Sequence, residues 1–140
     1  MEEMTASLVW QTDKQFLGTT GSEHQVLIDG NRETNIGASP MELVLTGMGG
    51  CSAYDVVHIL GKSRQNVTKC VTRLTAQRSS EVPAVFTNIH IHFEVAGEGL
   101  SDDKVARAVE LSAEKYCSAS IMLSRGGVNI THGYEIVTSD

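Results

Sequence analysis

The sequence predicts an α+β fold with an N-terminal antiparallel β-meander, a long central buried helix and a second sheet with further helices. Three observations predict it. Segments rich in β-forming residues fill the first thirty positions, a long apolar segment follows a helix-start signal near residue 40, and the apolar pattern takes a period of two between residues 67 and 96. The predicted helices fall between groups of strands, which favours α+β over a doubly wound sheet. The length of 140 residues fits a single domain, residues 1–140.

The first third of the chain predicts three short strands, Ala6–Gln11, Gln15–Thr19 and His24–Asp29, separated by turn residues. A three-stranded antiparallel meander is the simplest arrangement of such segments. The polar stretch that follows, from Asp29 to Pro40, has no periodicity, so we expect an exposed loop there.

A strong start signal predicts a helix from Pro40 to about Leu60. Ser39 stands at the N-cap, Pro40 at the first helical position and Glu42 in the first turn. The helix is apolar almost all the way round, so we expect it at the centre of the molecule. Because a chain of this size supplies only one modest sheet beyond the meander, a dimer that wraps two such helices between two sheets would cover both sides.

Two longer strands are expected after this helix, Val67–Arg78 and Val85–Ala96. In the second strand Val85 and Thr87 continue the apolar face of Ile89, and Phe86 belongs to the opposite face.

The last third predicts two helices and a strand. Ser101 caps a helix whose apolar stripe runs from Val105 to Tyr116 or Cys117, so Cys117 falls near its C-terminal end. Ser118 or Ser120 is expected to cap a short third helix, and a final strand covers Val128–Val137.

Composition excludes several classes of function. The net charge of −6 and the scattered Lys and Arg residues leave no basic footprint for nucleic acid. The N-terminus lacks a basic segment followed by an apolar one, and no uncharged apolar run is long enough to span a bilayer. We therefore expect a cytoplasmic protein with no nucleic-acid or membrane partner.

Three cysteines, Cys51, Cys70 and Cys117, form no C-x-x-C pair, which argues against a disulfide framework and a zinc knuckle. Cys51 lies beside Gly49 and Gly50, which leave open space at its sulfur, and Cys117 lies among small residues. Two such thiols on helices that share one core could form a reversible redox pair. An inert buried thiol is the alternative for Cys51, and Cys70 fits ordinary strand packing. The same glycines and Gly47 also suggest close approach of another backbone.

Helical spacing places Cys51, Asp55 and His58 on one stripe of the central helix. His58 lies about 10 Å along the axis from Cys51, too far for a direct Cys-His dyad. A charged Asp55 would raise the pKa of a thiol one turn away, so activation needs a cation or helix terminus from elsewhere. We interpret Asp55 and His58 as a polar pair in the core or at an interface.

His90 and His92 point to one face of a strand, a spacing that can hold a metal ion. No third ligand of matching placement is evident, so we predict no metal site and interpret them as part of a polar strand surface.

The segments Ser39–Leu43, Gly49–Cys51 and Glu114–Cys117 resemble the OsmC/Ohr family of osmotically inducible and organic-hydroperoxide-resistance proteins. Segments Cys51–Val57, Ser112–Cys117 and Asn129–His132 most resemble its YhfA-like branch. The likeness covers nearly the whole chain and implies an intertwined homodimer with two active sites at the subunit interface.

The resemblance also implies the roles of individual residues. Cys51 would be the peroxidatic thiol and Cys117 the resolving thiol, with a dithiol such as a lipoyl group as reductant and no haem, flavin or metal. An Arg paired with a Glu stabilises the thiolate in the peroxidase members. Arg32 is the only Arg before the helix, and Glu42 stands one position later than in those members.

Two functions are therefore open. One is a thiol-dependent peroxidase acting on organic hydroperoxides in oxidative-stress defence. The other is a dimeric protein that binds a small molecule or thiol ligand without rapid turnover. An enzyme needs Cys51 to be accessible and to have a lowered pKa, whereas a binding protein does not.

Overall fold

The computed structural model describes residues 2–138 and has the predicted α+β architecture. The chain forms two compact units, one up to Val44 and one from Leu45 onward, and helix α1 continues from the first into the second. The order of elements agrees with the sequence prediction, with one addition. A π-helical turn, η1 (Ser112–Tyr116), lies between the last two helices.

The N-terminal unit contains the predicted meander. Strands β1 (Ala6–Thr12), β2 (Gln15–Thr20) and β3 (Gln25–Asp29) form one antiparallel sheet in that order.

Buried Asp29 organises the loop that follows the meander. Its carboxylate accepts hydrogen bonds from the backbone N–H of Asn31 at 2.8 Å and of Ile36 at 3.2 Å, and from the Thr34 hydroxyl. These bonds hold the pKa of Asp29 below its ordinary value, with the Thr34 bond as the largest cause. The exposed loop expected here therefore has a fixed conformation at its start.

Helix α1 (Pro40–Lys62) begins with the predicted cap. The Glu42 N–H donates to the Ser39 hydroxyl at 3.3 Å, and the Ser39 N–H donates back to the Glu42 carboxylate at 2.8 Å. This reciprocal pair is a capping box, which satisfies two backbone donors at the start of the helix.

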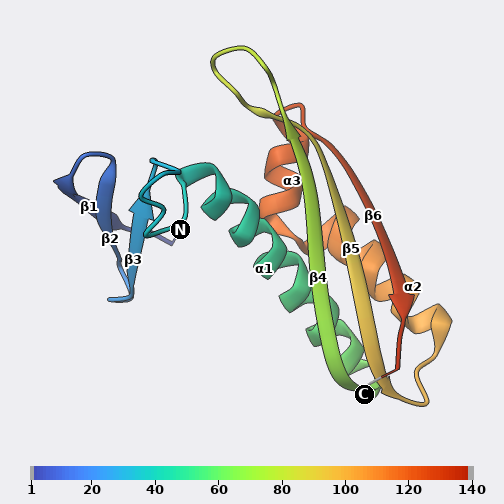
Figure 1. Cartoon of the computed structure of the whole chain (residues 1–140). Coiled ribbons are helices and arrows are strands. Elements are labelled where there is room, and N and C mark those ends of the chain that lie inside the picture. Colours follow the sequence, from blue (N-terminus) through green and yellow to red (C-terminus); the bar gives the residue numbers. More distant parts are fainter. Residues whose placement is uncertain (1, 139–140) are drawn as a thin grey trace. The chain divides into compact units, whose positions relative to one another are not determined.

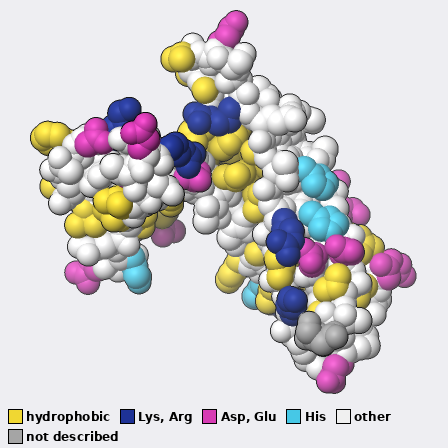
Figure 2. Space-filling view, viewed as in Figure 1, with side chains coloured by type: hydrophobic (Ala, Val, Ile, Leu, Met, Phe, Trp, Pro, Cys, Tyr) yellow, Lys and Arg dark blue, Asp and Glu magenta, His cyan; other side chains and the backbone are white. Residues whose placement is uncertain are grey.

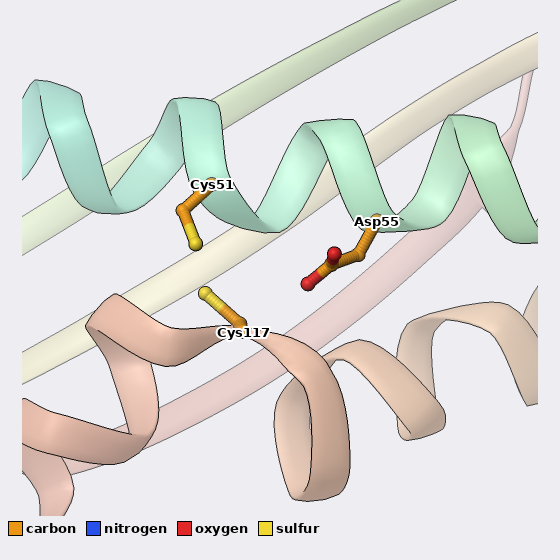
Figure 3. A group of neighbouring side chains, drawn as sticks. All are labelled: Cys51, Asp55 and Cys117. Carbon is orange, nitrogen blue, oxygen red and sulfur yellow. The ribbon is translucent and has the colours of Figure 1, made fainter. Parts of the chain in front are cut away.

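The second unit has a three-stranded sheet with helices on one face (Figures 1 and 3). Strands β4 (Asn66–Arg78) and β5 (Phe86–Glu98) are antiparallel, and β6 (Asn129–Ile136) pairs with β5 in parallel. The covering elements are α1, α2 (Asp102–Leu111), η1 and α3 (Ser118–Arg125). The outer face of the sheet is polar, and Figure 2 shows His, basic and acidic side chains gathered over it.

A β-bulge changes which residues of β5 face the core. Gln77 pairs with Asn88 but Arg78 pairs with Phe86, so Thr87 is an extra residue on β5. The extra residue reverses the alternation beyond it. Phe86 is therefore buried and Val85 is exposed, and the predicted faces of these two residues were wrong.

The sheet covers only one side of α1. Met48, Val56 and Leu60 are buried, whereas Tyr54 is 68% exposed and Val57 is 43% exposed. By length and composition alone, α1 is long and apolar enough to cross a membrane. Core helices of soluble proteins pass the same test. In the single chain, the central helix thus lacks the two-sided burial that its sequence predicts.

The sequence suggested that another backbone approaches the glycines of α1. In the structure a side chain approaches one of them, Gly49, and no other backbone among the described residues does. A Cβ on Gly49 would lie 2.6 Å from Cδ1 of Leu74 on β4, so this glycine lets β4 approach the helix. Within residues 2–138, no atom from another element lies within 4 Å of the corresponding positions on Gly47 and Gly50.

Substitution of Gly97 by Ala should destabilise the protein. Gly97 pairs with Val67 in the sheet, and a Cβ there would overlap the carbonyl oxygen of Asn66. We expect Gly97→Ala to lower the free energy of unfolding by about 1–3 kcal/mol, as overpacking does. Thermal and urea unfolding followed by circular dichroism measure this change.

The matched control is Gly61→Ala in the last turns of α1. Apart from the adjacent residues and backbone of the helix itself, no described atom lies within 4 Å of its Cβ position, and Ala is favoured over Gly in a helix by about 1 kcal/mol. Equal stability of the Gly97→Ala variant and the native chain would contradict the expected overlap.

Candidate functional site

The structure brings Cys51 and Cys117 together in the second unit, as their settings on two core helices suggested. Cys51 projects from the middle of α1, and Cys117 projects toward it from the start of α3 (Figure 3). The two sulfurs and a carboxylate oxygen of Asp55 all lie within 4.8 Å of one another. All three cysteines of the chain are free thiols.

Cys117 is a helix cap, not the end of a helix. Helix α2 stops at Leu111, the π turn η1 follows, and Cys117 has extended backbone angles (φ −74°, ψ 99°) as the N-cap of α3. Its sulfur accepts a hydrogen bond from the Ser120 N–H at 3.4 Å. The predicted caps, Ser118 and Ser120, were wrong because the π turn shifts the helix boundary and the thiol itself serves as the capping acceptor.

The Cys117 thiol is fully buried and well supplied with hydrogen-bonding partners. The Ser52 hydroxyl lies 2.9 Å from its sulfur, and the Ser120 N–H donates to the sulfur at 3.4 Å, while the Ser120 hydroxyl donates to the Cys117 carbonyl oxygen. Burial opposes ionisation, but the hydrogen bonds from Ser120 and Ser52 outweigh it and lower the pKa of Cys117.

For Cys51, burial outweighs the hydrogen bonding and the pKa is raised. Burial raises the pKa of its thiol, the nearby Cys117 and Asp55 raise it further, and a backbone hydrogen bond from Ala119 opposes them. Cys51 is nevertheless half-buried, while the Cys117 sulfur is inaccessible. Within the pair, the thiolate is therefore favoured on Cys117, and Cys51 is the less buried residue.

Asp55 is the site residue that our sequence interpretation did not select. It stands one turn after Cys51 on the same face of α1, and the Ser112 hydroxyl donates to its carboxylate at 3.3 Å. Burial raises the pKa of this carboxyl group. The i,i+4 spacing was visible in the sequence, but the position of Cys117 opposite that face was not.

The predicted pairing of Asp55 with His58 does not form. His58 is exposed and its ring stacks on Tyr54, with ring centroids 5.7 Å apart. His58 contributes to Asp55 only through its charge, which favours the carboxylate form and lowers the Asp55 pKa against the larger effect of burial.

The Arg32 and Glu42 side chains form an ion pair within the N-terminal unit. The Arg32 Nη1 atom lies 3.0 Å from Glu42 Oε1, and both side chains are exposed. Hydrogen bonds from the Ser39 backbone and from Arg32 hold the pKa of Glu42 below its ordinary value. The N-terminal unit therefore has an exposed Arg–Glu ion pair, with Glu42 in the first turn of α1.

Cys70 is separate from the cysteine pair. It is half-buried on β4, with its sulfur 4.0 Å from the Thr72 hydroxyl, and burial raises its pKa. It borders an apolar hollow of about 400 Å³ on the side of α1 that carries Tyr54 and Val57.

His90 and His92 lie on the polar outer face of the sheet. A nitrogen of His90 lies 2.6 Å from the Thr131 hydroxyl, and one of His92 lies 3.2 Å from the Glu135 carboxylate. Their position agrees with the polar strand surface that we predicted.

Comparison with known proteins places these residues in context. Residues 30–133 match the family described as OsmC-like protein. Protein YhfA of Escherichia coli K12 is 52% identical over 136 residues, which cover 97% of this chain and all of YhfA. A hypothetical protein from Aquifex aeolicus VF5 is 30% identical, with a TM-score of 0.88 and full coverage of both chains.

A more distant structure shares the fold alone. It is an organic hydroperoxide resistance protein OsmC from Legionella pneumophila, described as a predicted redox protein. It is 14% identical, with a TM-score of 0.72 and coverage of 96% of this chain and 98% of that one.

Replacing Asp55 by Asn should make Cys51 more acidic. The Asp55 charge raises the pKa of the Cys51 thiol, so its removal lowers that pKa and increases the thiolate fraction at neutral pH. We expect several-fold faster iodoacetamide alkylation of Cys51 at pH 7.5, measured by peptide mass spectrometry, and a rate–pH profile shifted to lower pH.

The control is Glu114→Gln, which makes the same change of charge at an exposed position in η1. It should leave the Cys51 profile unchanged. An identical profile in the Asp55→Asn variant would show that the Asp55 charge does not reach the thiol.

Proposed function

The chain belongs to the OsmC-like protein family, and from this membership we propose that it is a dithiol redox protein that reduces organic hydroperoxides. The single observation that carries the proposal is the proximity of two free thiols from positions 51 and 117 in one partly accessible site. The name of the Legionella pneumophila protein of the same fold, an organic hydroperoxide resistance protein, supports this choice of oxidant.

Cys51 is the peroxidatic thiol because it is the half-buried residue of the pair, whereas Cys117 is fully buried. In molecules in which Cys117 is ionised, its thiolate accepts the Cys51 proton when a hydroperoxide enters; the hydrogen bonds from Ser120 and Ser52 lower the pKa of Cys117 and so favour this form. Proton transfer across the pair thus supplies the nucleophile that the raised pKa of Cys51 otherwise withholds.

The Cys51 thiolate then attacks the distal peroxide oxygen. A sulfur–oxygen bond forms, the oxygen–oxygen bond breaks, and the alkoxide takes up a proton and leaves as an alcohol. Cys117 gives up its proton and its thiolate attacks the Cys51 sulfenic acid, so that a disulfide forms and hydroxide leaves as water. Two thiols are oxidised and one hydroperoxide is reduced. A dithiol of the lipoyl type restores both thiols by exchange.

The working unit in this proposal is a homodimer in the cytoplasm. A second copy would cover the side of α1 that carries exposed Tyr54 and Val57, which the sheet leaves open. Burial of each large apolar side chain contributes about 1.5–3 kcal/mol.

A raised pKa at Cys51 favours a second candidate function. A protein that binds a small apolar or thiol ligand needs no thiolate at this position. The apolar hollow beside Tyr54, Val57 and Cys70 offers about 400 Å³ for such a ligand. Oxidation kinetics separate the two functions.

Cumene hydroperoxide should oxidise the reduced protein much faster than hydrogen peroxide does, with formation of a Cys51–Cys117 disulfide. Stopped-flow fluorescence and mass spectrometry of the product measure both. We expect Cys51→Ser to abolish fast oxidation, and Cys117→Ser to allow one turnover that ends at the Cys51 sulfenic acid because the resolving thiol is gone.

Cys70→Ala is the matched control and should retain the full rate and the disulfide. Oxidation of the native chain at the slow rate of an ordinary free thiol would reject the peroxidase function and leave ligand binding as the better proposal.

Light scattering at micromolar concentration should give the mass of a dimer. Val57→Glu places a charge on the open side of α1 and should produce monomers, because an unpaired charge in an apolar contact is costly. Val82→Glu makes the same substitution in the loop between β4 and β5, where Val82 is 95% exposed, and should remain dimeric. A native monomer, or equal effects of the two substitutions, would contradict this interface.

A further inference from the structure

We propose that the reduced protein binds one thiophilic divalent cation of the Zn²⁺ type through Cys51, Cys117 and Asp55. The three donor atoms are two thiol sulfurs and one carboxylate oxygen, and they already lie within 4.8 Å of one another (Figure 3). Sulfur and carboxylate oxygen are both ordinary zinc ligands. The proposal adds a binding activity to the dithiol pair and does not depend on peroxide chemistry.

The backbone presents these donors as a zinc site requires. Cys51 and Asp55 are one turn apart on α1, and an i,i+4 spacing puts two ligands on one face of a helix. Cys117 enters from the opposite side, at the N-cap of α3. Two ligands from one helix and a third from a separate element surround a common point.

The distances are close to those of a bound ion. Zinc lies about 2.3 Å from a sulfur and about 2.0–2.2 Å from a carboxylate oxygen, so tetrahedral ligands stand about 3.4–3.8 Å apart. Donor atoms no more than 4.8 Å apart therefore need shifts of about 1 Å or less to reach this arrangement. Three protein ligands leave the fourth position open, as in zinc sites that also bind water or a small ligand.

A second layer of hydrogen bonds orients two of the three ligands. The Ser112 hydroxyl donates to Oδ2 of Asp55 at 3.3 Å, which leaves the other carboxylate oxygen available. The Ser52 hydroxyl and the Ser120 N–H lie at the Cys117 sulfur. Such outer contacts fix ligand geometry and strengthen metal binding in known sites.

The charges of the cluster also suit a divalent cation. Two thiols and a carboxyl group can carry up to three negative charges, and no Lys or Arg among residues 2–138 forms an ion pair with the Asp55 carboxylate. When Zn²⁺ binds, each thiol releases its proton to solvent and a zinc–sulfur bond replaces the sulfur–hydrogen bond. Formation of a Cys51–Cys117 disulfide removes both thiolates, so oxidation and metal binding exclude each other.

Metal titration of the chelator-treated, reduced full-length chain tests the proposal without any peroxide. Calorimetry with Zn²⁺ should give one ion per chain, and Co²⁺ should give the absorption bands of tetrahedral thiolate coordination. Cys51→Ser and Cys117→Ser should each weaken Zn²⁺ binding about 100-fold and remove the thiolate bands, and Asp55→Asn should weaken it about 10-fold. Ser112→Ala should weaken it by a smaller factor while the thiolate bands remain.

Cys70→Ser is the matched control and should bind Zn²⁺ like the native chain. Circular dichroism confirms that each variant is folded, and the disulfide-oxidised native chain gives a second measurement, since it should bind no Zn²⁺. Absence of binding, loss of binding in the Cys70→Ser variant, or unchanged binding in Asp55→Asn would overturn the three-ligand site. Because no peroxide is present, these results are independent of whether the protein is a peroxidase.

Discussion

The contact between Cys117 and α1 is the constraint on which the site depends. Cys117 caps α3 with its own sulfur, and the same sulfur meets the Ser52 hydroxyl of α1 at 2.9 Å. The sulfur is fully buried, so any displacement would leave the Ser52 and Ser120 groups without this partner. The separation from Cys51 is therefore set by the packing of two helices and by the π turn before Cys117, rather than by a mobile loop. Both thiol oxidation and metal binding gain from such a preorganised pair.

Local sequence signals predicted most of the fold. The features that they did not predict depend on contacts between residues that are distant in the sequence or on irregularities of the backbone. The helix caps at Ser39 and Ser101 were predicted correctly because a cap depends only on three or four adjacent residues. The cap by Cys117 was missed because a π turn has no comparable signal. Phe86 was placed on the wrong face because a bulge moves one residue without changing the composition. Asp55 was missed as a site residue because its role depends on Cys117, 62 positions away in the sequence.

The burial of α1 also depends on tertiary structure that the sequence does not show. Its sequence showed that both sides need cover, but not which side the chain itself covers. In the structure Val56 and Leu60 are buried, whereas Tyr54 and Val57 remain exposed. Gly50 and Ala53 border the hollow beside Tyr54, so the open side has an indented shape. Exposed apolar surface of this kind marks a contact with a partner, and aromatic residues such as Tyr54 are enriched in such contacts.

The thiol with the lower pKa and the thiol that is less buried are different residues of the site, and this limits its chemistry. The more acidic thiol, Cys117, is closed to solvent, and the accessible thiol, Cys51, has a raised pKa. Asp55 adds to that rise, so a cation near it would do two things at once. It would neutralise the carboxylate and favour the thiolate on Cys51. A cation supplied by a second subunit would activate Cys51 toward peroxides, whereas a metal ion held by the sulfurs themselves would occupy them. The kind of cation that meets Asp55 would thus determine whether the pair acts as a nucleophile or as a ligand set.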